Sequence, residues 1–166
     1  VPATLDATTV ADNLHQGARR GVVYSIGSSP LNAKQLWVGT DDGLIWRTDD
    51  AGAHWSNVTP KQLGAWSKVG SLSPSHFDQN TAFASVDRHR LDDRKPYIYR
   101  TTDGGKSWQS IVDGIPDGDF VDVVREDPVK HGQLSTGTDF GIFVSFDNGD
   151  HWHSLQQNLP AVSVRD

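Results

Sequence analysis

The sequence predicts an all-β fold, a β-propeller segment of three four-stranded antiparallel blades. Three observations support this expectation. One pattern, [ST]-x-D-x-G-x-x-W, occurs at 48–55, 101–108 and 145–152. A short run of strand-forming residues precedes each copy, and two more candidate strands lie ahead of that run. The composition agrees, because 16 Gly, 8 Pro and 6 Trp suit short strands joined by tight turns better than long helices.

The residue types of the pattern indicate a hairpin turn. An Asp can accept backbone N–H groups inside the turn, and a Gly takes positive φ without steric cost. The Trp that ends the pattern can bury a large ring against a neighbouring sheet. The positions expected to build the turns are Thr48, Asp50, Gly52 and Trp55, then Thr101, Asp103, Gly105 and Trp108, and finally Ser145, Asp147, Gly149 and Trp152.

The repeat divides the chain into blades of about 40 to 50 residues, the period of a propeller. We expect blades at about 21–59, 66–113 and 119–160, with a charged insertion, RHRLDDRKP, lengthening the second. Residues 1–20 are expected to form an N-terminal arm, so the propeller segment is 21–166, and its last residues, AVSVRD, look like the start of a fourth blade. The absence of Met predicts a processed chain or a fragment of a larger propeller.

Composition also excludes several functions. A net charge of −6 argues against a nucleic-acid partner, which needs clustered basic residues. No apolar run reaches the roughly 20 residues that span a bilayer, so no membrane insertion is expected. The absence of Cys excludes disulfides, thiolate metal sites and a Cys nucleophile.

The three turns resemble the Asp-box (BNR) repeat of sialidase, sortilin and WD40/YVTN-like propellers. The phrases YSIGSSP, WVGTDDG, RHRLDD and GDFVDVVREDP are similar to those of bacterial proteins with sortilin-like propellers, often named glycosyl hydrolases. The resemblance implies that the Asp residues of the turns are structural and lie away from the ligand. It also implies an extracytoplasmic or secreted protein.

The candidate ligand-binding residues are in the insertion, which follows the second strand of its blade. Loops in that position share one propeller face with the loops between blades. An Arg fork beside carboxylates suits acidic or hydroxylated groups, whereas a solvated loop whose charges pair with each other is the competing interpretation. The residues are Arg88, His89, Arg90, Asp92 and Asp93.

No catalytic residue, metal site or cofactor is assigned. Asp41, Asp42, Asp92, Asp119 and Asp139 are expected on the same face, but an excess of carboxylates does not define the pair that glycoside hydrolysis needs. The motif His151-Trp152-His153 has metal-ligand spacing without a third ligand nearby.

These observations predict a non-enzymatic interaction scaffold that binds protein, peptide or glycan. The alternative is part of a secreted glycoside hydrolase of the Asp-box class. Because three blades leave sheet edges and an apolar flank open, we also expect either further blades of a parent chain or self-association, with two copies closing a six-bladed ring.

Overall fold

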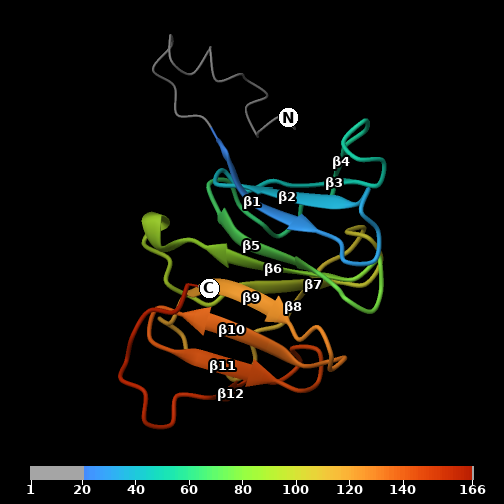
Figure 1. Cartoon of the computed structure of the whole chain (residues 1–166). Helices are drawn as coiled ribbons and strands as arrows, with labels where there is room; N and C mark the ends of the chain where they lie inside the picture. Colours follow the sequence, from blue (N-terminus) through green and yellow to red (C-terminus); the bar gives the residue numbers. More distant parts are fainter. Residues whose placement is uncertain (1–20, 166) are drawn as a thin grey trace.

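The structure is a computed structural model in which residues 21–165 are described. The expected N-terminal arm, 1–20, lies outside the described residues. The described strands form three four-stranded sheets (Figure 1). The first sheet contains β1 (Val23–Ser28), β2 (Leu36–Thr40), β3 (Ile45–Thr48) and β4 (Ser56–Asn57). The second contains β5 (Lys68–Pro74), β6 (Ala82–Asp87), β7 (Ile98–Thr101) and β8 (Gln109–Ser110). The third contains β9 (Val121–Glu126), β10 (Leu134–Thr138), β11 (Ile142–Ser145) and β12 (His153–Ser154).

Each sheet is an antiparallel meander whose strands follow chain order. The predicted fold of three four-stranded antiparallel sheets is therefore confirmed. Within 21–165 the only helical element is the 3-10 helix η1 (His89–Leu91), which the sequence did not indicate. No helix in this range is long or apolar enough to cross a membrane.

The sheets stack face to face, with the first strands β1, β5 and β9 next to one another (Figure 1). The second sheet lies between the other two, and so every residue of β6 is buried, whereas most of β1 is not. This position explains why β6 reads as a continuous apolar and small-residue run rather than an alternating one.

Two apolar clusters fill the spaces between the sheets. Trp37 and Ile45 of the first sheet pack against Leu72 of the second, and Phe83 of the second packs with Leu134 of the third. Each fully buried large side chain contributes roughly 1.5–3 kcal/mol relative to an exposed one. The core of this chain is therefore made between sheets, since each sheet alone has no covered face.

The first strand of each sheet is bulged near its beginning, at Val23–Ser25 in β1, Val69–Ser71 in β5 and opposite Gly137–Thr138 in β9. Bulges bend a strand and increase its twist. Close approach between sheets requires a small residue at this level, because a β-carbon added at Gly39 would lie 2.5 Å from Cγ1 of Val69. A bulge is thus repeated at the same level of the first strand in all three sheets.

Candidate functional site

The loops at one end of the sheets form a continuous face. The β2–β3 and β4–β5 loops are joined by the Trp66 N–H, which donates to the Asp42 carbonyl at 2.8 Å. The β6–β7 loop reaches its neighbours on both sides. Arg88 Nη1 donates to Ser67 Oγ at 2.5 Å, and Arg94 forms a 2.9 Å ion pair with Asp139 of the β10–β11 loop. Loops that the sequence placed on one face are therefore in contact.

The β6–β7 loop, residues 88–97, is fixed at its base by internal contacts. Arg88 Nε lies 2.9 Å from Asp93 Oδ2, and the Tyr97 hydroxyl donates to the same oxygen at 2.7 Å. Burial alone would raise the pKa of Asp93, but hydrogen bonds from Tyr97, Lys95 and Arg88 lower it. Burial and the adjacent Asp93 carboxylate raise the pKa of Tyr97 to about 12. Arg88 and Asp93 thus hold the base of the loop.

An aromatic residue that precedes the third sheet packs against the β6–β7 loop. The ring of Phe120, just before β9, stacks on the His89 imidazole with centroids 4.9 Å apart. The Arg94 guanidinium lies 5.4 Å from the same ring centroid. A cation over an aromatic face is stabilising by about 0.5–1 kcal/mol at an exposed site. The Phe120 ring therefore orders two side chains of the loop, a role that the sequence did not indicate.

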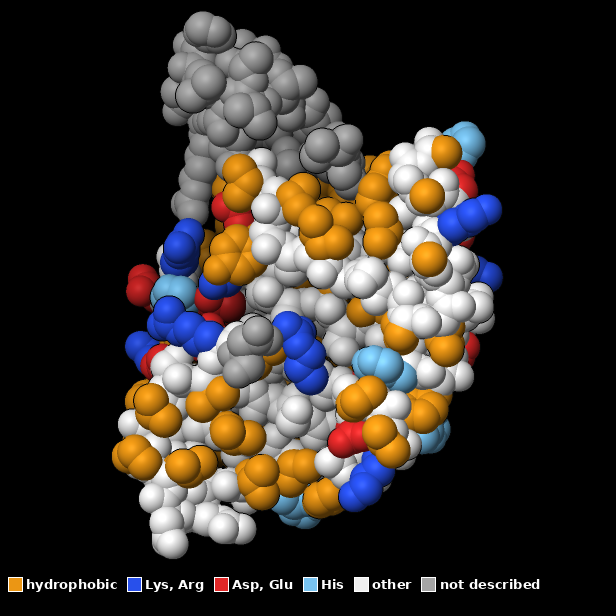
Figure 2. Space-filling model, viewed as in Figure 1, with side chains coloured by type: hydrophobic (Ala, Val, Ile, Leu, Met, Phe, Trp, Pro, Cys, Tyr) orange, Lys and Arg blue, Asp and Glu red, His pale blue; other side chains and the backbone are white. Residues whose placement is uncertain are grey.

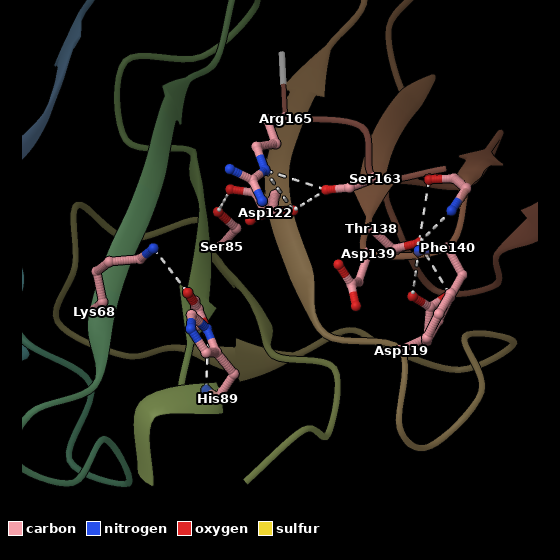
Figure 3. A network of polar contacts seen from close by, with 12 residues as sticks. Lys68, Ser85, His89, Asp119, Asp122, Thr138, Asp139, Phe140, Ser163 and Arg165 are labelled. Atoms are coloured by element: carbon pink, nitrogen blue, oxygen red, sulfur yellow. Dashed lines mark hydrogen bonds and ion pairs between the residues drawn. The ribbon is translucent and has the colours of Figure 1, made fainter. Parts of the chain in front are cut away.

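A buried carboxylate at the end of β6 contacts the His89 side chain of this cluster. Asp87 Oδ2 forms an ion pair with Lys68 Nζ at 2.8 Å, and Asp87 Oδ1 lies 2.6 Å from His89 Nδ1 (Figure 3). Burial would raise the pKa of Asp87, but the contacts with Lys68 and His89 lower it. Lys68 Nζ also lies 4.8 Å from the Tyr24 ring centroid. This group connects the first strands of two sheets to the loop.

A second carboxylate, Asp122 of β9, lies near this group. Ser163 Oγ donates to Asp122 Oδ2 at 3.2 Å, and Arg165 Nε lies 4.0 Å from the same oxygen (Figure 3). Burial raises the pKa of Asp122, and the nearby Asp87 carboxylate acts in the same direction. The two carboxylates therefore have pKa values shifted in opposite directions.

Asp119 occupies a third polar position on this face. Its Oδ2 accepts from Thr138 Oγ at 2.9 Å and its Oδ1 from the Phe140 N–H at 3.2 Å (Figure 3). Burial raises the pKa of Asp119 despite these hydrogen bonds. Because both carboxylate oxygens of Asp119 accept hydrogen bonds from the β10–β11 turn, this side chain stabilises the turn.

The five predicted ligand-binding residues lie in one loop but differ in their surroundings. Arg88 and Asp93 pair with each other, and His89 bonds to Asp87. Arg90 and Asp92 are exposed, and Asp92 caps η1 with a left-handed φ of 58°. Four further residues complete the cluster. Asp139 was expected on this face, whereas Lys68, Asp87 and Phe120 were not indicated by the sequence.

The three repeated turns lie at the opposite end of the sheets and share one hydrogen-bond pattern. In the first, Thr48 Oγ donates to Asp50 Oδ1 at 2.8 Å and accepts the Gly52 N–H at 3.0 Å. Asp50 Oδ1 also accepts the His54 N–H at 2.9 Å. The same bonds recur in the second turn with Thr101, Asp103, Gly105 and Ser107, and in the third with Ser145, Asp147, Gly149 and His151.

These bonds lower the pKa of each turn carboxylate. The main causes are the His54 backbone bond for Asp50 and the His151 side chain for Asp147. The Ser107 side chain holds the pKa of Asp103 at about 2. All three carboxylates are thus engaged within their own turns.

A polar groove of about 830 Å³ lies between the first and second sheets at the rim, beside the second turn. Its walls include Arg47, Asn80, Asp103 and Trp108. The Trp108 indole N–H donates to the Val58 carbonyl at 2.7 Å, so its polar atom is already used by the sheet interface. Within 21–165 there is no group of three side chains suited to bind a metal ion, and the His151 imidazole is 2.7 Å from Asp147.

Comparison with known proteins shows that this chain is similar to proteins whose activities differ from one another. No family model matches the chain. A solved structure, "YCF48 bound to D1 peptide", superposes with a TM-score of 0.66 at 21% identity, over 87% of this chain and 43% of that one. This chain is a β-propeller segment.

Two curated proteins are similar to parts of the propeller segment. One is vacuolar protein sorting/targeting protein 10 of Sordaria macrospora, 43% identical over 67 residues. The other is a probable oligoxyloglucan-reducing end-specific xyloglucanase of Neosartorya fischeri, 29% identical over 87 residues. These matches cover 40% and 50% of this chain but only 4% and 10% of the relatives. The propeller segment is thus similar to a sortilin-like sorting protein and to a glycosidase.

Proposed function

We propose that this propeller segment is a non-enzymatic interaction scaffold that binds a protein or peptide segment on the face formed by the β6–β7 loop. The observation that carries the proposal is the cluster around Phe120, where His89 and Arg94 are held on one ring. Side chains ordered in advance lose less conformational entropy when a partner binds. The repeated turns at the other end take a structural part, since their carboxylates are already occupied.

Charge on the loop favours an acidic partner. The loop has four basic side chains, Arg88, Arg90, Arg94 and Lys95, against the acidic Asp92 and Asp93, in a chain of net charge −6. Arg88 pairs with Asp93 and Arg94 pairs with Asp139, which leaves the exposed cations Arg90 and Lys95 against the single carboxylate of Asp92. Basic side chains gather on the side of the molecule from which this loop projects (Figures 1 and 2). Complementary charge supports both the specificity and the rate of association.

Apolar side chains beside these cations supply contact area. Leu91 of η1 is 40% exposed, and Phe140 of the β10–β11 loop is 49% exposed. An interface typically combines such apolar contacts with Arg anchors and a polar rim. We therefore infer that the ligand is a peptide segment with carboxylates and at least one large apolar side chain, and glycan is the less favoured ligand. The structurally similar YCF48 bound to a D1 peptide supports a peptide ligand.

Fluorescence anisotropy with a labelled Asp/Glu-rich peptide containing one Phe tests this proposal. The matched probe is the same peptide with Asn and Gln in place of the acids. We expect tighter binding of the acidic peptide and a loss of about tenfold or more with Arg90→Glu. The control variant is Lys106→Glu, the same charge change in the second turn at the opposite end of the sheets. Equal binding of both peptides, or equal losses in both variants, would overturn the proposal.

A second candidate is that the segment contributes to a secreted glycoside hydrolase. The supporting observation is Asp122, whose pKa is raised by burial and by the nearby Asp87 carboxylate, the direction that a general acid of glycoside hydrolysis requires. The partial similarity to a xyloglucanase favours the same chemistry. Release of reducing sugar from xyloglucan, lost in Asp122→Asn, would establish it. Either function is compatible with an extracytoplasmic location, which we infer from the same relatives.

A further inference from the structure

The polar groove at the rim between the first and second sheets has a counterpart between the second and third sheets, and the two differ in shape. The first groove is one continuous space of about 830 Å³. Its counterpart consists of two separate spaces of about 400 and 370 Å³, and Asp150 lines both of them. Binding sites for small molecules typically enclose roughly 300–1,000 Å³. Only the first groove is therefore both continuous and large enough for a ligand of several rings.

An ion pair divides the second groove. Arg100 of β7 crosses from the second sheet to the third, where it pairs with Asp150 at 3.0 Å and donates to the Asn148 carbonyl at 2.9 Å. Gln109 of β8 accepts a hydrogen bond from the same guanidinium at 2.9 Å. Because Asp150 lines both spaces, this contact is what separates them.

The same positions of the first groove have different side chains. Arg47 of β3 is the equivalent of Arg100, but Lys106 stands in the place of Asp150. A lysine cannot neutralise an arginine, and Arg47 instead pairs with Asp49 of its own sheet at 2.8 Å. The Arg47 Nη1 atom lies beside Gly104 and forms no hydrogen bond within residues 21–165. The first groove consequently stays open.

The charges on the walls of the first groove are not balanced. Lys61 and Lys106 line it, are exposed and form no ion pair with any described residue. The two acidic residues of the walls are engaged, because Asp49 pairs with Arg47 and Asp103 accepts hydrogen bonds from its own turn. The groove thus lacks the carboxylate that its counterpart contains. A ligand carboxylate in that place would pair with both Arg47 and Lys106.

The other walls favour a ligand rich in hydroxyl groups. Gln62 Nε2 donates to the Trp108 carbonyl at 3.2 Å, and Asn57 Oδ1 accepts the Thr59 N–H at 3.0 Å, so each amide is held by one atom and keeps the other for a ligand. The half-buried Trp108 ring is fixed by its bond to Val58 and offers a flat surface to a sugar ring. None of the exposed large apolar side chains of residues 21–165 lines the groove, whereas a protein partner needs such anchors.

We propose that this groove binds an acidic saccharide. The sugar carboxylate lies between Arg47 and Lys106, as the Asp150 carboxylate lies beside Arg100. The hydroxyl groups bind the Asn57 and Gln62 amides. The groove is at the opposite end of the sheets from the β6–β7 loop, so the proposal is independent of peptide binding there. A change at Lys106 should accordingly affect the saccharide and leave the peptide unaffected.

Isothermal titration calorimetry with trigalacturonate tests the proposal. The matched probe is the methyl ester of the same trisaccharide, which keeps the rings and hydroxyl groups but has no charge. We expect the ester to bind about tenfold or more weakly than the acid, because it loses the charge-assisted hydrogen bonds. Equal binding of the two, or no binding of either, would overturn the proposal. Displacement of the trisaccharide by an equal concentration of an Asp/Glu-rich peptide would overturn the ligand class.

A substitution that closes the groove provides a sharper test. Lys106→Asp recreates the Arg100–Asp150 pair with Arg47, so we expect the affinity for trigalacturonate to fall by at least about 30-fold. The melting temperature should not fall, because the new carboxylate has a partner. The control is Lys130→Asp, the same charge change at an exposed residue of the β9–β10 loop, which should leave the affinity unchanged. Unaltered affinity in Lys106→Asp, or equal losses in both variants, would contradict the proposed site.

The two turn tryptophans locate the ligand within the folded chain. Trp108 lines the first groove, whereas Trp152 is 3% exposed beside the divided one. In a nitrogen–proton correlation spectrum, trigalacturonate should shift the Trp108 indole signal and leave that of Trp152 in place. Shifts that are equal for both indoles, or that spare Trp108, would exclude the groove as the site.

Discussion

The first and third turns have the same residue pattern and the same internal hydrogen bonds, but they lie in different surroundings. Trp152 is 3% exposed and its indole bonds to the second sheet, whereas Trp55 is half-buried. The turn itself is determined locally, because its bonds join residues two to four positions apart. The comparison shows that one motif makes different contributions to stability, depending on the sheet beside it.

The largest expected effect separates the two tryptophans. Trp152→Ala should lower the free energy of unfolding by about 3–5 kcal/mol, because it leaves a cavity between sheets. Trp55→Ala should cost only about 1 kcal/mol, because the Trp55 side chain is half-buried. Urea denaturation followed by far-UV circular dichroism measures both changes. Equal losses would mean that the turns do not differ in packing.

The turn glycines should differ in the same direction by a smaller amount. Gly149→Ala combines a φ of 92° with a clash against Ile111 Cδ1, so we expect a loss of about 2–4 kcal/mol. Gly52→Ala has a φ of 94° without the clash and should cost about 1 kcal/mol. Thermal unfolding measures both. Adding Ile111→Val removes the clashing atom and should recover part of the Gly149→Ala loss, and no recovery would place the strain elsewhere.

Acid should weaken all three turns together. Each turn carboxylate has a pKa below its ordinary 3.8, and that of Asp103 is about 2. A lowered folded-state pKa stabilises the fold fully above 3.8, and this stabilisation is lost as the pH falls towards 2. Urea midpoints at pH 5, 4 and 3 should decline, and Asp103→Asn should make the decline shallower. An identical slope in the variant would exclude this turn as a cause.

The smallest effect distinguishes the third turn from the second near neutral pH. The Asp147 carboxylate raises the pKa of His151, whereas Ser107 occupies that place in the second turn. A raised folded-state pKa stabilises the fold below the ordinary 6.5, and this stabilisation is lost as the pH rises through the folded value. His151→Ser should remove this pH dependence between pH 6 and 8. NMR titration of the His151 ring measures the pKa directly, and an ordinary value would contradict the pairing.

The sequence predicted much of the fold because its signals are local. The repeated Asp, Gly and Trp and the strand-forming runs before them indicated the turns and the three sheets. It also indicated the loop at 88–96, which stands out by its length and charge. It could not indicate the role of Phe120 or the ion pair between Asp139 and Arg94, because both arise from contact between sheets. Nor could it show that Arg88 and Asp93 pair with each other while Arg90 stays exposed.

The sequence by itself determined the turns, the number of sheets and their order, since hydrogen bonds between near neighbours and strand propensity are enough for these. Only the tertiary structure decided which of the three turn tryptophans are buried and which charged side chains face solvent. The Trp108 and Trp152 indoles bond to carbonyls 50 and 41 residues away, distances over which a local pattern gives no information. The burial of the turn tryptophans and the pKa shifts of Asp87 and Asp122 depend on which sheet lies alongside, and that is set by packing.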